Sequence, residues 1–388
     1  MFENIKWKDN GKLKLLIIVG TRPEIIRLAA SINKCREYFD TILAHTGQNY
    51  DYNLNGVFFR DLKIAEPDVY LDAVGANLGE TMGNIIARSY ELMEAIKPDA
   101  VFVLGDTNSC LSVIGAKRLH IPIFHMEAGN RCFDECLPEE TNRRIVDIIS
   151  DVNMCYSEHA RRYLNASGVA KERTYVVGSP MAEVLHGNLS DIEKSEILDK
   201  LGLEKGKYIL LSAHREENID TEENFESLMN AINAMAKKYD MPILYSCHPR
   251  SKKFIEKRGF QFDERVIQHE PLGFHDYNKL QMNAFCVVSD SGTLPEEASF
   301  FLSVGNPVPA VCIRTSTERP EALDAGDFIL AGISETQLLQ AVDMAVEMNK
   351  KGDLGKPTET YTDENVSTKV VKLIQSYTGI VNKMVWRK

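Results

Sequence analysis

The sequence predicts an α/β protein built from two doubly wound parallel sheets. Short apolar runs rich in Val, Ile and Leu alternate along the chain with longer stretches of helical period, which is typical of parallel sheets covered by helices on both faces. The chain has 388 residues, whereas one hydrophobic core stops growing at roughly 250 to 300 residues, so two domains are expected.

The apolar runs form two sets of predicted strands. The first set lies at residues 15–19, 41–45, 100–104, 121–126, 152–156 and 175–177. The second set lies at residues 208–212, 243–247, 265–268, 285–288 and 308–313. The polar segment 185–206 between them contains Gly187-Asn188 and many charges, which is typical of a linker. We therefore expect one domain at residues 1–186 and another at residues 187–362.

Two amphipathic helices are predicted together with their buried faces. Residues 80–97 place apolar side chains at helical spacing, which indicates a crossover helix whose core positions are Met82, Ile85, Ile86, Leu92, Met93 and Ile96. Residues 363–378 place Val366, Val370, Val371 and Ile374 on one face, with Gly379 as the expected stop. This last helix is a candidate to pack back on the first domain.

Charge and composition exclude several partners. Lys and Arg total 45 against 56 Asp and Glu, so the net charge of -11 repels nucleic acid and acidic membranes. The run 12–20 resembles a signal peptide, but residues 21–24 follow it without a small-residue cleavage site, and no stretch of about 20 apolar residues occurs. We expect a cytoplasmic protein without a membrane segment.

Missing motifs narrow the chemistry further. The eight cysteines are widely spaced and the nearest pair, Cys132 and Cys136, lacks the C-x-x-C spacing of zinc or redox sites, so free buried thiols are expected. No G-x-G, Walker A, D-x-D or HExxH motif occurs. The sequence therefore predicts no metal, no bound dinucleotide and no other cofactor.

Polar motifs follow the predicted strands, where ligands bind in an open parallel sheet. In the first half they lie at residues 20–24, 105–108, 127–131 and 178–180. In the second half they lie at residues 213–218, 248–250, 269–271, 289–293 and 314–321. One cleft between the domains is expected to collect them.

The phosphate candidate is the turn Ser291-Gly292-Thr293. Pro295 follows it, as at a helix start whose N–H groups and positive dipole end favour a pyrophosphate, and Glu297 is a candidate to bind the ribose diol. An ordinary capped turn is an equally weighted alternative.

Four cationic residues stand at strand ends, where buried positive charge needs an anionic ligand or an acidic partner. They are Arg22, His214, Arg314 and Arg319, of which Arg22 and His214 are the preferred phosphate contacts. For any single arginine, a surface or interdomain salt bridge is at least as good an interpretation.

Three carboxylates are candidates for acid and base chemistry. Asp106 and Glu127 each follow a predicted strand, and Glu139 lies in the segment 137–143. Carboxylates clustered in a partly dry cleft raise one another's pKa, which makes an acid and a base available near neutral pH. The alternatives are that Asp106 caps a helix and that Glu139 and Glu140 complement a helix dipole.

These motifs, taken in order, resemble the non-hydrolysing UDP-N-acetylglucosamine 2-epimerase family over nearly the whole chain. The resemblance rests on residues 20–24, 105–107, 127–129, 138–143, 178–180, 214–215, 290–292 and 317–321. It implies two Rossmann-like domains facing across a cleft in the glycosyltransferase-B arrangement, a homodimer, and inversion at C2 of a UDP-2-acetamido sugar.

The resemblance also implies residue roles. Asp106, Glu127 and Glu139 match the acid/base carboxylates of the family, and Arg143 matches an active-site arginine. His214 and Arg22 match residues near the pyrophosphate, while Ser291, Gly292 and Glu297 match the UDP site.

Several positions depart from the family pattern. Asn130 replaces the usual Leu, Thr293 replaces a second Gly, Glu216 stands where Arg is frequent, and residues 299–306 are longer than usual. Together with Cys132-Phe133-Asp134 they resemble the branch that makes UDP-N-acetyl-L-fucosamine from UDP-N-acetyl-L-talosamine for capsule or O-antigen synthesis. Gln48-Asn49 keeps only part of the activator-binding motif.

Four other functions stay open at this point. They are a UDP-N-acetylglucosamine/UDP-N-acetylmannosamine 2-epimerase, a UDP-sugar glycosyltransferase of the same fold, a hydrolysing epimerase, and a non-catalytic UDP-sugar sensor. The three carboxylates favour elimination and re-addition over transfer, because a glycosyltransferase needs only one base.

Overall fold

A computed structural model describes residues 2–47, 56–247 and 249–388 of the chain. The motif residues Gln48-Asn49 and His248 lie outside the described residues. The chain divides into two compact units: unit 1 is Met1–His186 with Asp363–Lys388, and unit 2 is Gly187–Thr362. Among the described residues each unit contains one sheet, seven-stranded in unit 1 and six-stranded in unit 2.

The sheet of unit 1 is entirely parallel and has the strand order β3-β2-β1-β4-β5-β6-β7. Its strands are β1 (Lys14–Val19), β2 (Asp40–His45), β3 (Val69–Tyr70), β4 (Ala100–Leu104), β5 (Ile123–Met126), β6 (Val152–Cys155) and β7 (Thr174–Val176). The order reverses between β1 and β4, and at such a switch point the loops at the carboxyl ends diverge and leave room for a ligand.

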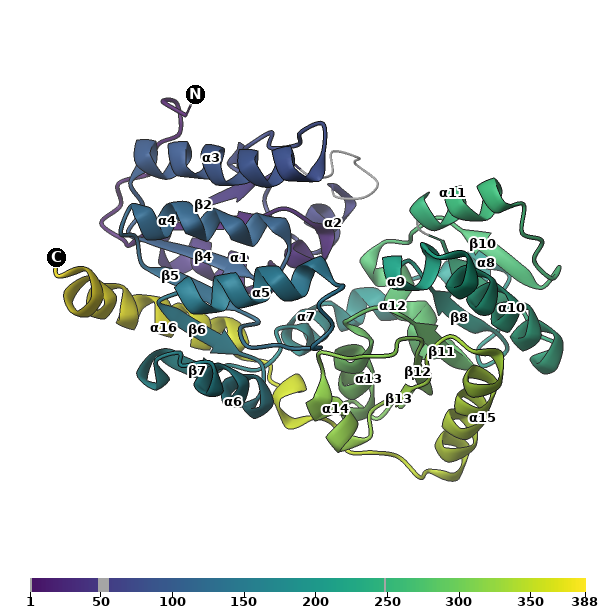
Figure 1. Cartoon of the computed structure of the whole chain (residues 1–388). Helices are drawn as coiled ribbons and strands as arrows, with labels where there is room; N and C mark the ends of the chain where they lie inside the picture. The colour runs from purple at the N-terminus through teal and green to yellow at the C-terminus, as the bar shows by residue number, and fades with distance from the viewer. Residues whose placement is uncertain (1, 48–55, 248) are drawn as a thin grey trace. The chain divides into compact units, whose positions relative to one another are not determined.

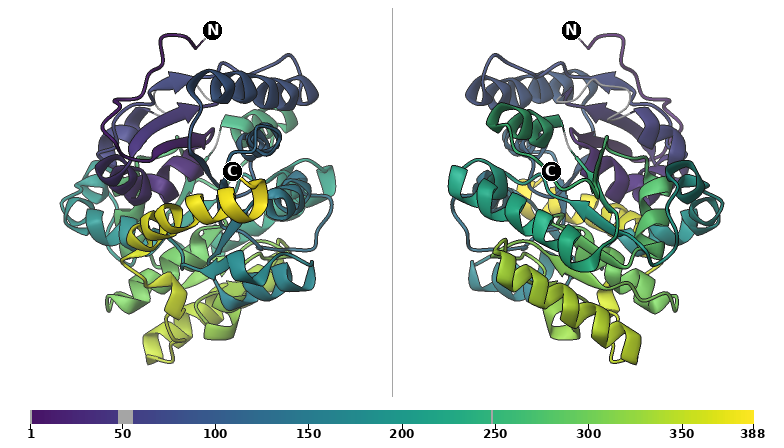
Figure 2. Two further views of the ribbon diagram at one scale, coloured as in Figure 1. Left: turned by 90° about the vertical axis from the view of Figure 1, so that its left-hand side faces the viewer. Right: turned by 90° about the vertical axis from the view of Figure 1, so that its right-hand side faces the viewer.

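Helices cover both faces of this sheet. Figure 1 shows α3 (Leu78–Ile96), α4 (Val113–Arg118) and α5 (Pro138–Ile149) side by side over one face. The C-terminal helix α16 (Val366–Val381) packs against α1 (Arg22–Tyr38) and can be followed in both views of Figure 2. The other helices of the unit include α2 (Gly56–Asp61), α6 (Glu158–Ala166), the 3₁₀ turns η1 (Asn108–Ser112) and η2 (Lys171–Arg173), and the π-helical turn η4 (Asn382–Trp386).

The sheet of unit 2 is also parallel, with the order β10-β9-β8-β11-β12-β13. Its strands are β8 (Ile209–Ser212), β9 (Ile243–Ser246), β10 (Val266–His269), β11 (Cys286–Ser289), β12 (Ala310–Cys312) and β13 (Ile329–Leu330). Its helices are α8 (Ile197–Leu201), α9 (Glu216–Ile219), α10 (Glu222–Tyr239), α11 (Pro249–Arg258), α12 (Phe274–Asn283), α13 (Leu294–Ser303), α14 (Pro320–Ala325) and α15 (Glu335–Lys351). The switch point lies between β8 and β11.

The predicted doubly wound α/β class is confirmed, and the differences are local. Strands β3 and β13 were not predicted, because each has two residues and so gives no apolar run. Helix α16 continues past Gly379, the expected stop, because Val381 extends its buried face. The polar segment predicted as a linker is largely helical: α7 (Met181–Glu193) runs across residues 186 and 187, and it buries Leu185 and Ile192.

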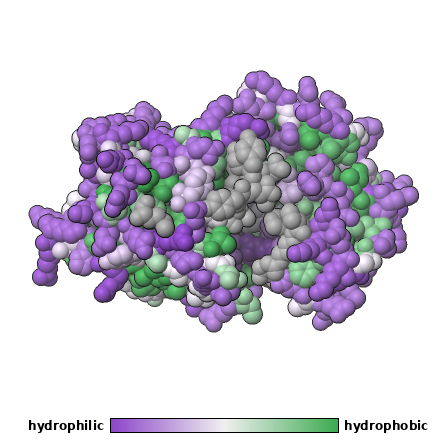
Figure 3. Space-filling model, turned by 90° about the horizontal axis from the view of Figure 1, so that it is seen from above, coloured by the Kyte–Doolittle hydropathy of each residue, from purple (hydrophilic) through white to green (hydrophobic). Residues whose placement is uncertain are grey.

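The face of the molecule drawn in Figure 3 is polar. It carries mainly hydrophilic side chains, with apolar ones in scattered groups. Within the described ranges, every helix is too short or too polar to cross a membrane.

The turn that follows β5 depends on a glycine. Gly129 has φ +81°, and a Cβ atom there would lie 2.4 Å from the carbonyl oxygen of Ala160 and 2.8 Å from Leu164 Cγ. Ala160 and Leu164 belong to α6 and are fully buried with Ala128 in a small core of their own. The backbone of this turn therefore touches α6 directly.

We expect Gly129→Ala to destabilise unit 1 more than Gly168→Ala. Gly168 has the same φ of +81°, but a Cβ there has open space, so its replacement costs about 1–2 kcal/mol of conformational strain alone. Gly129→Ala adds a steric overlap with backbone. Urea unfolding of both variants measures the difference, and equal losses would contradict this account of the turn.

Candidate active site

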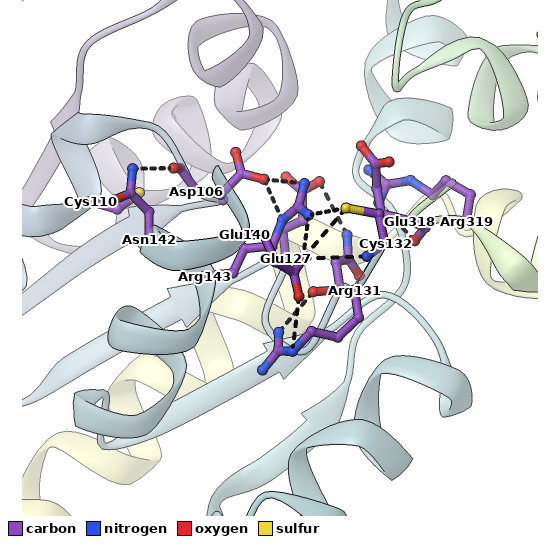
Figure 4. A network of polar contacts seen from close by, with 12 residues as sticks. Asp106, Cys110, Glu127, Arg131, Cys132, Glu140, Asn142, Arg143, Glu318 and Arg319 are labelled. Carbon is purple, nitrogen blue, oxygen red and sulfur yellow. Dashed lines mark hydrogen bonds and ion pairs between the residues drawn. The ribbon is translucent and has the colours of Figure 1, made fainter. Parts of the chain in front are cut away.

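Asp106 follows β4 and is held by an arginine. Arg143, on α5, approaches Asp106 Oδ2 with both Nε and Nη2 at 2.6 Å, as Figure 4 shows. Its Nη1 donates to Glu140 Oε2 at 3.0 Å. Arg143 is buried, whereas the Asp106 side chain keeps 17% of its surface exposed. Asp106 is therefore a fixed carboxylate that solvent or a ligand can reach.

Glu127 follows β5 in a strained backbone conformation. Its φ is +67°, in the left-handed region that costs a non-glycine residue roughly 1–2 kcal/mol. The side chain is 5% exposed and accepts from Arg27 Nη1 of α1 at 2.5 Å and from Asn130 Nδ2 at 3.2 Å. Backbone strain of this kind gathers at functional sites, where the surrounding contacts hold it in place.

The two glutamates at the start of α5 differ in burial and in their ion-pair partners. Glu140 is 1% exposed and pairs with Arg143 and, at 3.3 Å, with Arg144. Glu139 is only half-buried and lies outside this network, because successive helix residues point about 100° apart. The sequence predicted Glu139 as an acid/base carboxylate, with a helix-dipole role for Glu139 and Glu140 as the alternative. The acid/base role of Glu139 stays a prediction.

Sequence reasoning did not single out Glu24, although it lies in the motif 20–24. Glu24 is 1% exposed and accepts from the Gly20 N–H at 3.1 Å, from Thr21 Oγ1 at 2.8 Å and from Ser109 Oγ of η1. Burial raises the pKa of this carboxyl, and the hydroxyl donors only partly offset that effect. Glu24 thus ties the turn after β1 to the turn after β4.

Arg22, a predicted phosphate contact, is the first residue of α1. Its guanidinium lies over the ring of Phe58, 5.4 Å from the centroid, and its side chain is partly exposed. This position at the positive end of a helix suits an anion.

In unit 2, Asp290 organises the turn after β8. It is fully buried, directly follows β11, and its Oδ2 accepts from the backbone N–H groups of His214 and Arg215, both at 2.8 Å. His214 Nδ1 lies 3.2 Å from Asp290 Oδ1, while the imidazole remains 37% exposed. Asp290 therefore holds both the backbone and the imidazole of His214 in a position that is partly open to solvent.

The predicted phosphate turn does precede a helix. Thr293 is the N-cap residue of α13, and the residues 291–293 are partly exposed. The Thr293 hydroxyl donates to Glu297 Oε1 at 2.9 Å instead of capping the helix, and Gln281 Nε2 donates to Glu297 Oε2 at 3.0 Å. This geometry differs from an ordinary capped turn. The roles of Ser291, Gly292, Thr293 and Glu297 in binding UDP stay predictions.

Arg314 and Arg319 are paired within unit 2. Arg314 is 2% exposed and donates to Glu318 at 2.7 Å, while Arg319 is 1% exposed and donates to Glu296 Oε1 from Nε and Nη2 at 3.0 and 2.8 Å. Sequence reasoning offered an anionic ligand or an acidic partner for such buried charge, and the structure supplies the acidic partner. Their contact with UDP stays a prediction.

The eight cysteines differ in burial. All eight cysteines are free, but Cys132 is half-buried and Cys136 exposed, so the expectation that all are buried is wrong for these two. Both lie in the loop before α5, and Cys132 Sγ is 3.5 Å from Arg143 Nη1.

Within the described ranges, no group of three or more His, Cys, Asp or Glu side chains is arranged to hold a metal ion.

Two doubly wound parallel domains, with arginine-held carboxylates at one carboxyl edge and an exposed helix-start turn at the other, define an α/β enzyme of the glycosyltransferase-B-like fold. Residues 33–375 match the sequence model of the family described as UDP-N-acetylglucosamine 2-epimerase. The chain belongs to this family and is an isomerase.

Individual relatives agree over almost their whole lengths. The UDP-N-acetylglucosamine 2-epimerase of Methanococcus maripaludis is 34% identical over 348 residues, which cover 87% of this chain and 93% of the relative. The structure of UDP-N-acetylglucosamine 2-epimerase from Rickettsia bellii has a TM-score of 0.89 at 45% identity and covers 97% and 100% of the two chains. The Methanocaldococcus jannaschii enzyme in complex with UDP-GlcNAc and UDP has a TM-score of 0.86 at 31% identity, covering 94% and 100%.

We expect Arg319→Met to destabilise unit 2 by about 3–5 kcal/mol, because it leaves Glu296 buried without its guanidinium partner. Replacing both residues, as Arg319→Met with Glu296→Leu, should recover most of this loss. Urea unfolding is the measurement. The control is Lys351→Met, which breaks an exposed pair with Glu347 and should cost less than about 1 kcal/mol. A double variant no more stable than the single one would contradict the pairing.

Proposed function

We propose that the chain interconverts UDP-N-acetylglucosamine and its C2 epimer, UDP-N-acetylmannosamine. The observation that carries this proposal is a pair of carboxylates, Asp106 and Glu127, at the carboxyl ends of the adjacent strands β4 and β5 in a member of the 2-epimerase family. Each faces an arginine, Arg143 or Arg27, that holds it in place.

The chemistry of the substrate explains the need for two such groups. The C2 proton of a UDP-2-acetamido sugar is not adjacent to a carbonyl group, so its removal alone gives no stabilised anion. Coupling loss of the proton to departure of UDP from C1 forms a 2-acetamidoglycal. Returning a proton to the opposite face of C2 while UDP re-adds at C1 completes the inversion. Elimination and re-addition consume no oxidant, reductant or cofactor, because the proton and the UDP that leave the sugar are both replaced.

The residues supply a group for each step. Asp106 and Glu127 exchange protons with C2 as general acid and base. The departing diphosphate gains negative charge, which the His214 imidazole and the first N–H groups of α13 can stabilise. Arg22 is the further candidate for a phosphate contact. A homodimer in the cytoplasm belongs to the same proposal, on the family resemblance.

A second sugar is favoured by two departures from the family pattern. Asn130 donates to Glu127 Oε1 and so touches an acid/base candidate, while Cys132 contacts Arg143, the arginine that holds Asp106. This supports UDP-N-acetyl-L-talosamine, converted to UDP-N-acetyl-L-fucosamine for capsule or O-antigen synthesis, as the alternative substrate. Both sugars would undergo the same elimination and re-addition.

We expect deuterium to appear at C2 when the protein is incubated with UDP-N-acetylglucosamine in D₂O, with the UDP linkage intact. NMR of the sugar protons follows the exchange. The UDP-L-talo sugar reacting in its place would establish the alternative substrate. Release of free sugar would identify a hydrolase, and UDP accumulating only with an added acceptor would identify a glycosyltransferase.

In the same assay, Asp106→Asn and Glu127→Gln should each lower the rate by about 10² to 10⁴, since each removes one acid/base group. Glu135→Gln is the matched control, because Glu135 precedes α5 and pairs only with the exposed Arg144 among the contacts described. Full activity in the Asp106 or Glu127 variant would refute its assigned role.

A further inference from the structure

A buried histidine of unit 1 lies next to the loops that carry Asp106 and Glu127. His125, in β5, is 1% exposed. Its Nε2 is 2.8 Å from the carbonyl oxygen of Gly105, the residue before Asp106. Its Nδ1 is 3.1 Å from Oδ1 of Asp147, on α5. The imidazole thus joins the turn after β4 to a helix on the face of the sheet.

Asp147 in turn holds the loop that follows Glu127. It is fully buried, and its Oδ1 accepts from the Gly129 N–H at 3.1 Å. Its Oδ2 accepts from Arg131 Nη1 at 2.6 Å. One carboxylate therefore binds the histidine and two positions of the loop 127–131.

The partners of His125 favour its charged form. The Gly105 carbonyl can only accept, so Nε2 donates to it, while Nδ1 lies at ion-pair distance from the Asp147 carboxylate without meeting hydrogen-bond geometry. Burial alone would lower the pKa of His125, but the neighbouring Asp147 carboxylate outweighs it and raises the pKa. Burial would raise the pKa of Asp147, yet His125 and Arg131 hold it below its ordinary value.

The contacts continue in a closed ring. Arg131 Nε lies 4.0 Å from Glu140 Oε1, Glu140 pairs with Arg143, and Arg143 pairs with Asp106, which adjoins Gly105 in the chain. Figure 4 shows Asp106, Arg143, Glu140 and Arg131 in this sequence. The ring alternates in sign from His125 through Asp147 to Asp106. Glu127, the other charged group near His125, lies two residues further along the chain.

We propose that His125 and Asp147 form a positioning pair that fixes the distance and orientation of Asp106 relative to Glu127. The inference rests on the proposed 2-epimerase function and adds two residues to it. Neither residue needs to touch the sugar. A misplacement of about 1 Å in an acid/base group can cost about 10²-fold in rate, so the pair should govern kcat more than substrate binding.

The test compares His125→Gln and Asp147→Asn with a matched control, Asp151→Asn. Asp151 is also a buried carboxylate that supports β5, but it binds the opposite end of the strand, accepting from Ile123 N at 3.0 Å and Lys117 Nζ at 2.7 Å. We expect kcat to fall about 10²-fold in the first two variants, with KM and UDP affinity nearly unchanged. Asp151→Asn should lose stability but keep kcat.

If kcat falls equally in all three variants, the pair has only a structural role and the proposal is overturned. The double variant His125→Gln with Asp147→Asn should lose little more than either single change, because both act through the same loops. An additive loss would also overturn it. A wild-type protein that exchanges no C2 proton refutes the 2-epimerase function instead, which separates the two failures.

A second measurement does not depend on activity. In a ¹⁵N NMR titration, the doubly protonated ring of His125 should persist to a higher pH in the wild-type protein than in Asp147→Asn, because the neighbouring carboxylate raises the pKa of the ring. Asp151→Asn should titrate like the wild type. Equal titration of His125 in the wild-type protein and in Asp147→Asn would contradict the arrangement.

Discussion

The buried arginines at the carboxyl edges of both sheets depend on carboxylates from neighbouring turns and helices. Removing a guanidinium from water costs several kcal/mol, which a single well-placed carboxylate can offset only through close geometry. In unit 1 this condition joins Arg143 to Asp106 and Arg131 to Asp147. In unit 2 it joins Arg319 to Glu296. The loops that carry these charges are therefore held rigidly.

Rigid loops at a strand edge suit a reaction that needs an acid and a base at a set spacing. The backbone contributes to this, because Glu127 and the glycines at 105 and 129 all adopt positive φ. Each such residue turns the chain sharply as it leaves a strand, so that the next side chain stays at the sheet edge. The cost of the strained Glu127 backbone is offset by its contacts with Arg27 and Asn130.

Family membership establishes the fold and the kind of reaction, whereas the choice of sugar depends on single side chains. The relatives establish the fold and the kind of reaction over nearly the whole chain. The proposed choice of sugar rests on local contacts, in which Asn130 donates to Glu127 and Cys132 contacts Arg143. A family assignment that covers nearly the whole chain therefore leaves the choice of sugar to a few local contacts.

The amino-acid sequence by itself determined the two parallel sheets, most strand positions and the placement of Asp106, Glu127, His214 and the turn 291–293 at strand ends. These follow from local periodicity and from the rule that loops at carboxyl ends of parallel strands gather at one edge. Only the tertiary structure decided which charges pair. Arg319 and Glu296 are 23 residues apart, and Asp106 and Arg143 are 37 apart. These ion pairs join separate elements through space, so no pattern within one segment of sequence reports them.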